Sequence, residues 1–218
     1  LHLDAISLAW GTNAEPMQTL LIFGLGLMLV GLGFKGAFVP FHQWTPDVYQ
    51  GARSPITAFM PAGSKIAATA ALIRGLDGMA ALSDYWMPAL FWVAILTMSV
   101  GNLVACMQKD VKRILGYSSI AHAGYLLVAV LAHAKDPVAI GFGTISYYLV
   151  AYTLMTVGAF AIITMNVRGG KEGTSLSDLN GLWQRSPYAA GLLVLFMVSL
   201  VGIPPTAGFF GKLYIFYD

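Results

Sequence analysis

Long apolar runs separated by short polar loops constrain this chain more than any other feature of its sequence. A helix needs about 20 consecutive apolar residues to cross the hydrocarbon core of a bilayer. Because unpaired backbone polar groups are not tolerated in lipid, each such run is predicted to be helical. The candidate spans are residues 17 to about 39, 56–76, 86–107, 111–133, one span within 138–167, and a run that starts near residue 188 and continues toward the last residue. The predicted fold is therefore all-α, a polytopic bundle of transmembrane helices.

The composition supports this fold class. Hydrophobic residues make up 57% of the chain and charged residues 10%, whereas soluble domains carry about 25% charged residues. A net charge of +2 over 218 residues is too small for a nucleic-acid-binding surface, so no nucleic-acid partner is expected. Cys106 is the single cysteine, which excludes an intrachain disulfide and a CxxC metal or redox motif. We expect the lipid bilayer as the surroundings, and no metal or cofactor.

The charges in the loops predict the orientation of the spans. If the loops alternate between the two sides of the membrane, one side carries Arg53, Lys109, Lys112, Arg113, Arg168, Lys171 and Arg185. The other side carries two basic residues and five acidic ones, namely Arg74, Lys135, Asp4, Glu15, Asp77, Asp84 and Asp136. Cytoplasmic loops carry an excess of Lys and Arg, so the first side is predicted to be cytoplasmic.

The longest polar loop, residues 168–187, contains a helix-start signal. Ser175 followed by Asp178 resembles a capping box with Asp in the usual Glu position. Four large apolar residues would then share one helical face, namely Leu176, Leu179, Leu182 and Trp183. This pattern predicts a short helix at the membrane interface.

Three lysines fall within or beside the apolar spans. Lys65 is nearly central in its span, Lys35 lies late in the first run, and Lys212 follows the interruption GIPPTAG at residues 202–208. A lysine at the bilayer centre costs about 2.5–3.5 kcal/mol on insertion scales and usually faces a protein interior or a water-filled cavity. Snorkelling to the headgroups is an equally good explanation for Lys35. It is a poor one for Lys65, which lies about nine residues, or roughly 14 Å, from the nearer end of its span.

A histidine and three prolines add to this pattern. His122 sits in the middle of the fourth span, and an isolated histidine there would be a hydrogen-bonded packing residue. Beside buried lysines it becomes a candidate proton relay, because its pKa lies nearest to physiological pH. Pro40 and the pair Pro204–Pro205 interrupt two apolar runs. A packing kink would explain one break, but two breaks near lysines favour broken helices that line an ion path.

Four segments of the sequence carry a family resemblance. They are FKGAFVPFHQWTPDVYQGA, SKIAATAALIR, DVKRILGYSSIAHAGYLL and GIPPTAGFFGKLYIF, in this order along the chain. Together they resemble the antiporter-like membrane subunits of respiratory complex I, the NADH–quinone oxidoreductase, and PFHQWTPDVYQG is most similar to subunit N. The match covers most of the chain and is specific, because several long motifs keep their order.

The resemblance implies a fold of two inverted five-helix repeats, each with a broken helix. Residues 1–218 would be one transmembrane domain and a fragment of a longer chain, with the last two helices of the first repeat up to about residue 80 and part of the second repeat in 81–218. The family also uses a glutamate on an earlier helix, which we expect to lie before Leu1. The expected location is the bacterial inner membrane, as a multi-pass protein.

The resemblance also implies a function and its residues. The fragment would belong to a subunit that translocates protons, driven by quinone reduction elsewhere in the complex. Lys35, Lys65 and Lys212 match the family's lysines, and His122 lies on a helix that contributes to the polar axis. The expected partners are the other membrane subunits of complex I and the bilayer, with quinone met only through the complex. No redox site is expected within this chain.

Two other functions remain open at this stage. A cation/proton antiporter subunit of the multi-subunit type shares the fold, and sodium-dependent transport without quinone would favour it. A passive structural membrane subunit would make the buried lysines dispensable. An enzyme active site within the chain is the least favoured, because there is no cofactor motif and no carboxylate pair within a span.

Overall fold

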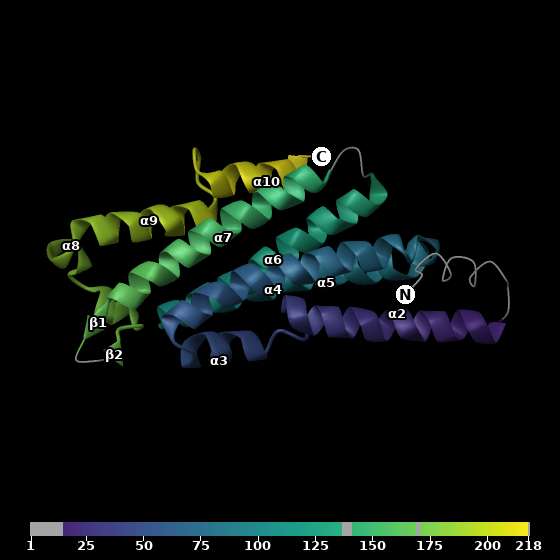
Figure 1. The fold of residues 1–218 in the computed structure, drawn as a ribbon, viewed down its shortest axis with the longest axis horizontal. Coiled ribbons are helices and arrows are strands. Elements are labelled where there is room, and N and C mark those ends of the chain that lie inside the picture. Colours follow the sequence, from purple (N-terminus) through teal and green to yellow (C-terminus); the bar gives the residue numbers. More distant parts are fainter. Residues whose placement is uncertain (1–14, 137–140, 169–170, 218) are drawn as a thin grey trace.

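The computed structural model describes residues 15–136, 141–168 and 171–217, which form an elongated bundle of helices (Figure 1). The long helices are α2 (Glu15–Gly36), α4 (Ser54–Asp77), α5 (Ser83–Ala105), α6 (Val111–Lys135) and α7 (Phe142–Met165). The shorter ones are α3 (Trp44–Gly51), α8 (Leu182–Arg185), α9 (Pro187–Val201) and α10 (Ala207–Tyr217), with single 3-10 turns η1 (Ala80–Leu82) and η2 (Leu176–Leu179). Strands β1 (Val167–Arg168) and β2 (Lys171–Glu172) form a two-residue antiparallel ribbon.

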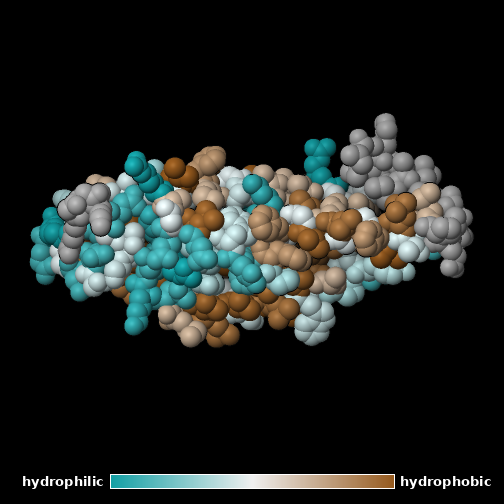
Figure 2. Space-filling model, turned by 90° about the horizontal axis from the view of Figure 1, so that it is seen from below, coloured by the Kyte–Doolittle hydropathy of each residue, from teal (hydrophilic) through white to brown (hydrophobic). Residues whose placement is uncertain are grey.

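Within the described residues, five helices are long and apolar enough to cross a membrane, and they correspond to the first five predicted spans. The sixth predicted run is divided between α9 and α10. The prediction of an all-α membrane bundle with two broken helices is therefore confirmed. The charged loops gather at the bundle end where Figure 1 places α3, β1, β2 and α8, and Figure 2 shows hydrophilic residues concentrated there.

Helix α6 forms the centre of the bundle. Two thirds of its apolar window is buried (67%), against 11% for α2. Its contact with α5 is close because glycines replace side chains at the crossing. A Cβ atom added to Gly101 of α5 would lie 2.5 Å from the backbone nitrogen of Ala121, and one added to Gly124 of α6 would lie 2.5 Å from Met98 Cγ. Small residues of this kind let membrane helices approach each other closely.

The first break separates α2 from α3. Phe38 N donates to the Gly33 carbonyl (2.8 Å) and Ala37 N to the Phe34 carbonyl (3.2 Å), while Ala37 has a left-handed φ of 61°. These bonds are those of a Schellman motif, which ends a helix at a left-handed residue. The helix therefore ends at Gly36, before Pro40, which lies exposed in the link to α3. The first helix ends about three residues earlier than predicted, because the Schellman turn stops it before the proline does.

The second break separates α9 from α10 and contains Pro204 and Pro205, both exposed in the link. Gly202 follows the last residue of α9 and has a φ of 88°, a left-handed conformation that glycine adopts without steric cost. Its N–H donates to the Val198 carbonyl at 3.0 Å. At this turn the chain leaves the helix, so the carbonyls of the last residues of α9 have no hydrogen-bond partner inside the helix.

The polar loop after α7, which we call the latch, is hydrogen-bonded to residues at the starts of α4 and α6. Glu172 accepts a hydrogen bond from Lys112 Nζ (2.6 Å) and two from Ser54, through its N–H (3.1 Å) and its hydroxyl (2.5 Å). Thr174 adds a bond to Asp110 Oδ2 at 2.6 Å. Lys112, counted among the loop charges in the sequence analysis, is therefore a buried ion-pair partner, with 3% of its side chain exposed.

The capping box in this loop is confirmed. Asp178 Oδ2 accepts from the Ser175 N–H at 3.0 Å, and Ser175 Oγ accepts from a backbone N–H of the following turn. The predicted single interfacial helix is wrong, because η2 and α8 are separate. Gly181 between them has a φ of 73°, which no helix interior accommodates.

Candidate functional site

Lys65 lies inside the bundle, on the face of α4 that packs against α7 and α6. Its side chain is 3% exposed. Its ammonium donates a hydrogen bond to the backbone carbonyl of Ser119 on α6 and lies 5.6 Å from the centroid of the Tyr152 ring on α7. A cation within about 6 Å of an aromatic face is attracted by the ring. The ammonium is thus held by a carbonyl and a ring, and no carboxylate among the described residues forms an ion pair with it.

His122 is buried on α6, with 2% of its surface exposed. Its Nδ1 lies 2.5 Å from the hydroxyl of Tyr148, and its ring centroid lies 4.9 Å from that of Tyr152. The imidazole also lies beside the backbone carbonyl of Leu200 at the end of α9. The direction of the bond to Tyr148 depends on the tautomer of the imidazole: a protonated Nδ1 donates, and an unprotonated Nδ1 accepts.

Lys212 on α10 forms hydrogen bonds to the end of α9 across the second helix break. Its Nζ donates to the carbonyls of Leu200 and Val201, each at 2.9 Å. These carbonyls belong to the last turn of α9, where no following helical N–H can reach them. The C-terminal end of a helix also carries partial negative charge, which favours a cation. The break thus builds a site for the Lys212 ammonium, which in addition lies 4.8 Å from the Tyr125 ring centroid.

These groups form one continuous line through the bundle. The Tyr152 ring lies between Lys65 and His122, and the Leu200 carbonyl joins His122 to Lys212. Both lysines are close enough to act electrostatically on His122. Three of the four residues singled out in the sequence, carried by α4, α6 and α10, are therefore neighbours in space. Groups that bind and release protons in sequence are what a proton path requires.

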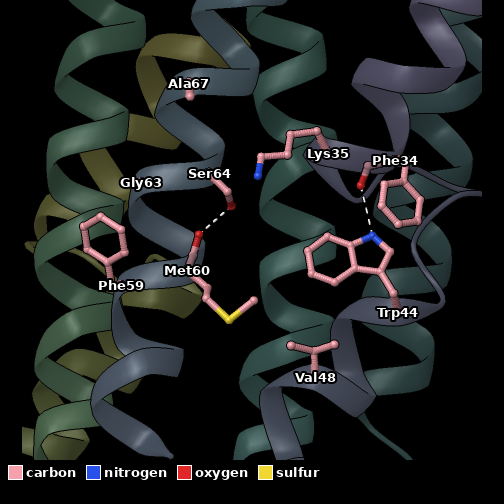
Figure 3. Close-up of a pocket in the computed structure, with 9 residues that line it drawn as sticks. All are labelled: Phe34, Lys35, Trp44, Val48, Phe59, Met60, Gly63, Ser64 and Ala67. Carbon is pink, nitrogen blue, oxygen red and sulfur yellow. Dashed lines mark hydrogen bonds between the residues drawn. The ribbon is translucent and has the colours of Figure 1, made fainter. Parts of the chain in front are cut away.

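Lys35 stands apart from this line. It lies on the last turn of α2 and is exposed, in an open pocket of about 640 Å³ between α2, α3 and α4. Figure 3 shows its ammonium directed toward Ser64 of α4. Ser64 and Lys65 are neighbours in sequence but face different sides of α4, one into this pocket and the other into the core. The structure thus does not bring Lys35 into the same interior as the other three residues.

Sequence reasoning missed the hydroxyl groups that surround the lysines and the histidine. Tyr148 and Tyr152 are both buried on α7, and buried Thr156 continues the same stripe one turn later. Their spacing of four residues inside an apolar span was a usable signal, because such residues share one helical face. On α6, Ser119 Oγ lies 3.2 Å from the hydroxyl of Tyr49 and extends the polar line toward α3.

Glu172 lies outside the spans, and its hydrogen bonds determine the direction in which the pKa of its carboxyl group is shifted. Burial alone raises the pKa of this carboxyl, but the bonds from Lys112 and Ser54 outweigh it and hold the pKa of Glu172 below its usual value. Glu172 is therefore ionised at neutral pH and neutralises the buried Lys112. The described residues contain no group of three or more His, Cys, Asp or Glu side chains that could hold a metal ion.

A family model described as "NADH:quinone oxidoreductase/Mrp antiporter, TM" matches residues 1–218, the whole chain. The chain belongs to this family. A curated relative, NADH-quinone oxidoreductase subunit N 1 of Sorangium cellulosum, is 50% identical over 97% of this chain and 42% of its own length. Subunit N of Chromohalobacter salexigens is 45% identical over 98% of this chain and 44% of its own. The chain thus spans less than half the length of these relatives.

Two solved structures have a fold similar to that of this chain. A chain of respiratory complex I from Thermus thermophilus matches with a TM-score of 0.76 and 41% identity, over 93% of this chain and 43% of that one. A chain of the Mrp complex from Dietzia sp. matches with a TM-score of 0.78 and 25% identity, over 96% and 38%. Family membership and the five apolar helices make this a multi-pass protein of the bacterial inner membrane.

Proposed function

We propose that this chain is part of the membrane subunit N of an NADH–quinone oxidoreductase and that it translocates protons through Lys65, His122 and Lys212. The observation that carries the proposal is the line of contacts from buried Lys65 across Tyr152 and His122 to half-buried Lys212. The other membrane subunits of complex I are the proposed partners. Quinone is reached only through the complex, and no redox reaction is assigned to this chain.

The proposed roles of the two lysines and His122 in proton transfer follow from their charges. Two ammonium groups flank one imidazole, so a proton on His122 is repelled by each lysine that is charged. Proton arrival at His122 therefore favours proton loss from a neighbouring lysine. In the tautomer whose Nδ1 accepts from Tyr148, that hydroxyl must turn from donor to acceptor before Nδ1 can receive the proton. Transfer along the line is thus coupled to a small rotation of a buried hydroxyl.

Lys35 has a different place in the proposal. It lies at the first helix break, in an open pocket whose far wall is formed by α4. The same helix carries Lys65 on its buried face, so α4 separates the pocket from the line. We propose that charge enters from the α2 side through Lys35. Residues up to about 80 and residues 81–218 are proposed to be parts of two repeats.

A cation/proton antiporter subunit is the second candidate function, supported by the likeness to the Mrp complex. The identity to that structure is 25%, against 41% to complex I and 50% to a curated subunit N. These values favour the first proposal. Sodium-dependent proton movement in vesicles that lack quinone would instead favour the antiporter.

The test replaces Lys65 in the full-length subunit within the assembled complex. Lys65→Ala is expected to reduce proton pumping about tenfold or more, because a positioned proton donor contributes about 10²–10⁴-fold to rate. Lys65→Arg should also fail, since an arginine keeps the charge but does not release its proton. Pumping is measured by quenching of a pH-sensitive dye in inverted vesicles, and assembly by native electrophoresis.

The matched control is Lys135→Ala, because Lys135 is exposed at the far end of α6 and lies outside the line. It should pump as the parent does. Unchanged pumping by an assembled Lys65→Ala complex would leave Lys65 as a packing residue and support the passive structural subunit instead.

A further inference from the structure

The second half of the first broken helix, α3, packs against the first turns of α6. At the start of α6, Arg113 Nη1 donates to Asp47 Oδ1 (2.6 Å) and to Gln50 Oε1 (3.0 Å) of α3. About one turn later α6 carries a glycine, and a Cβ atom added to Gly116 would lie 3.3 Å from Pro46 Cα. These contacts bring α3 close enough to α6 for a side chain of the first break to reach the interior of the bundle.

Tyr49 of α3 lies in that interior and contacts both α6 and α7. It is 2% exposed, and its ring meets that of Phe160 on α7 edge-on, with the centroids 6.1 Å apart. Its hydroxyl lies 3.2 Å from Ser119 Oγ on α6. The backbone carbonyl of the same serine is the only hydrogen-bond acceptor of Lys65 among the described residues. Tyr49 and Lys65 therefore contact two groups of one residue.

The hydroxyl of Ser119 has a different partner from other hydroxyls in these helices. Elsewhere a hydroxyl donates to the carbonyl four residues earlier in its own helix, at 2.5–2.9 Å, as seen for Ser64, Thr97, Thr156 and Thr164. Within the part of the chain that the structure describes, Ser119 makes no such bond to Leu115, and its hydroxyl is paired with that of Tyr49 instead. The position of the Tyr49 hydroxyl thus accounts for the direction of the Ser119 side chain.

We propose that Tyr49 is a positioning residue for Lys65, because its hydroxyl holds the Ser119 side chain away from the preceding turn of α6. A serine that bonds back to that turn often bends its helix. Such a bend would displace the carbonyl that accepts from Lys65 and change the balance between the charged and neutral forms of the lysine. The inference rests on the proposed function, in which Lys65 carries a proton. It also connects the first helix break to Lys65, since Tyr49 belongs to α3.

The test is Tyr49→Phe in the full-length subunit within the assembled complex. The change removes one oxygen, keeps the ring beside Phe160 and leaves the Ser119 hydroxyl free to bond to the Leu115 carbonyl. The pH at which proton pumping is half-maximal should shift by about half a unit or more, because the net energy of one hydrogen bond is close to that of one pKa unit. The matched control is Tyr188→Phe, because Tyr188 is 86% exposed at the start of α9. It should keep the pH profile of the parent.

A double variant, Tyr49→Phe with Ser119→Ala, separates positioning from packing. The second change removes the hydroxyl that would bond back, so the double variant should recover the pH profile of the parent. A role of Tyr49 in packing alone predicts no recovery. An unshifted profile in Tyr49→Phe overturns the inference, and so does a shift that persists in the double variant. If Tyr49→Phe does not assemble, assembly of the double variant with the parent's profile supports the inference and any other result overturns it.

Failure of the proposed function is read separately, from Lys65→Ala. Normal pumping by an assembled Lys65→Ala complex would remove the proton-carrying role of Lys65. Reduced pumping by Lys65→Ala together with an unshifted profile in Tyr49→Phe would remove only the positioning role of Tyr49.

Discussion

His122 and Lys212 meet at the backbone carbonyl of Leu200, to which Lys212 Nζ donates at 2.9 Å and beside which the His122 imidazole lies. That carbonyl is available because α9 ends at Val201 and Gly202 turns the chain away. A continuous helix would have used the same oxygen for its own N–H four residues later. The break therefore connects two titratable side chains from different helices, which gives the interruption GIPPTAG a direct chemical consequence.

Gly202→Ala should weaken this connection. Its φ of 88° is costly for a residue with a Cβ, by about 1–2 kcal/mol, and the new Cβ would lie 3.1 Å from Lys212 Cδ. We expect lower thermal stability and slower pumping of the assembled complex. The matched control is Gly191→Ala within α9, where a Cβ would meet nothing within 4 Å. If both variants behave alike, the glycine turn does not position Lys212.

Tyr148→Phe should slow pumping while leaving the packing of α7 intact. The change removes the only hydroxyl within hydrogen-bond distance of His122 Nδ1 among the described residues, and it keeps the ring. Leaving a buried nitrogen unpaired costs about 1–3 kcal/mol. Pumping is compared with that of Tyr188→Phe, because Tyr188 is 86% exposed at the start of α9. Normal pumping by Tyr148→Phe would remove the hydroxyl from the proposed path.

The latch formed by Glu172 should make the loop after α7 sensitive to acid. Because the pKa of Glu172 is lower in the folded protein than its usual value near 4.5, its contribution to stability is present above that value. The contribution is lost as the pH falls through the folded-state pKa. Limited proteolysis of the loop should therefore accelerate as the pH is lowered below about 4.5, under a protease that is active in acid.

Glu172→Gln should be cleaved readily at every pH and lose this dependence. The matched control is Asp47→Asn at the same end of the bundle, because the pair of Asp47 with Arg113 is exposed and exposed ion pairs contribute little. If the pH profile of cleavage is the same in Glu172→Gln as in the parent, another group determines that profile.

The orientation is tested with Lys109→Cys and Lys135→Cys, each in the Cys106→Ser background. Both positions are exposed and lie at opposite ends of the bundle. The excess of basic residues around Lys109 predicts that position 109 faces the cytoplasm. An impermeant thiol reagent should modify it in inverted vesicles and not in intact cells, with the opposite result for position 135. The reverse pattern would invert the predicted topology.

The helices and their interruptions followed from the sequence alone, because both are local properties. Runs of apolar residues must be helical in lipid, and Pro40, Pro204 and Pro205 mark segments where helices cannot continue. The capping box at Ser175 and Asp178 was likewise readable, since its partners are three residues apart. The depth of Lys65 in its span already indicated a protein interior, because lipid alone would not accept an ammonium there.

Only the tertiary structure decided which of these residues meet. Lys35 and Lys65 lie in consecutive predicted spans, yet one faces an open pocket and the other the core, because they project from different faces of adjoining helices. Lys112 looked like a loop charge until Glu172, 60 residues later, folded back to pair with it. Tyr148, Tyr152 and the Leu200 carbonyl join the line through contacts between helices. Such contacts depend on helix rotation and crossing, which apolar periodicity in a lipid-soluble chain specifies weakly because nearly every face is apolar.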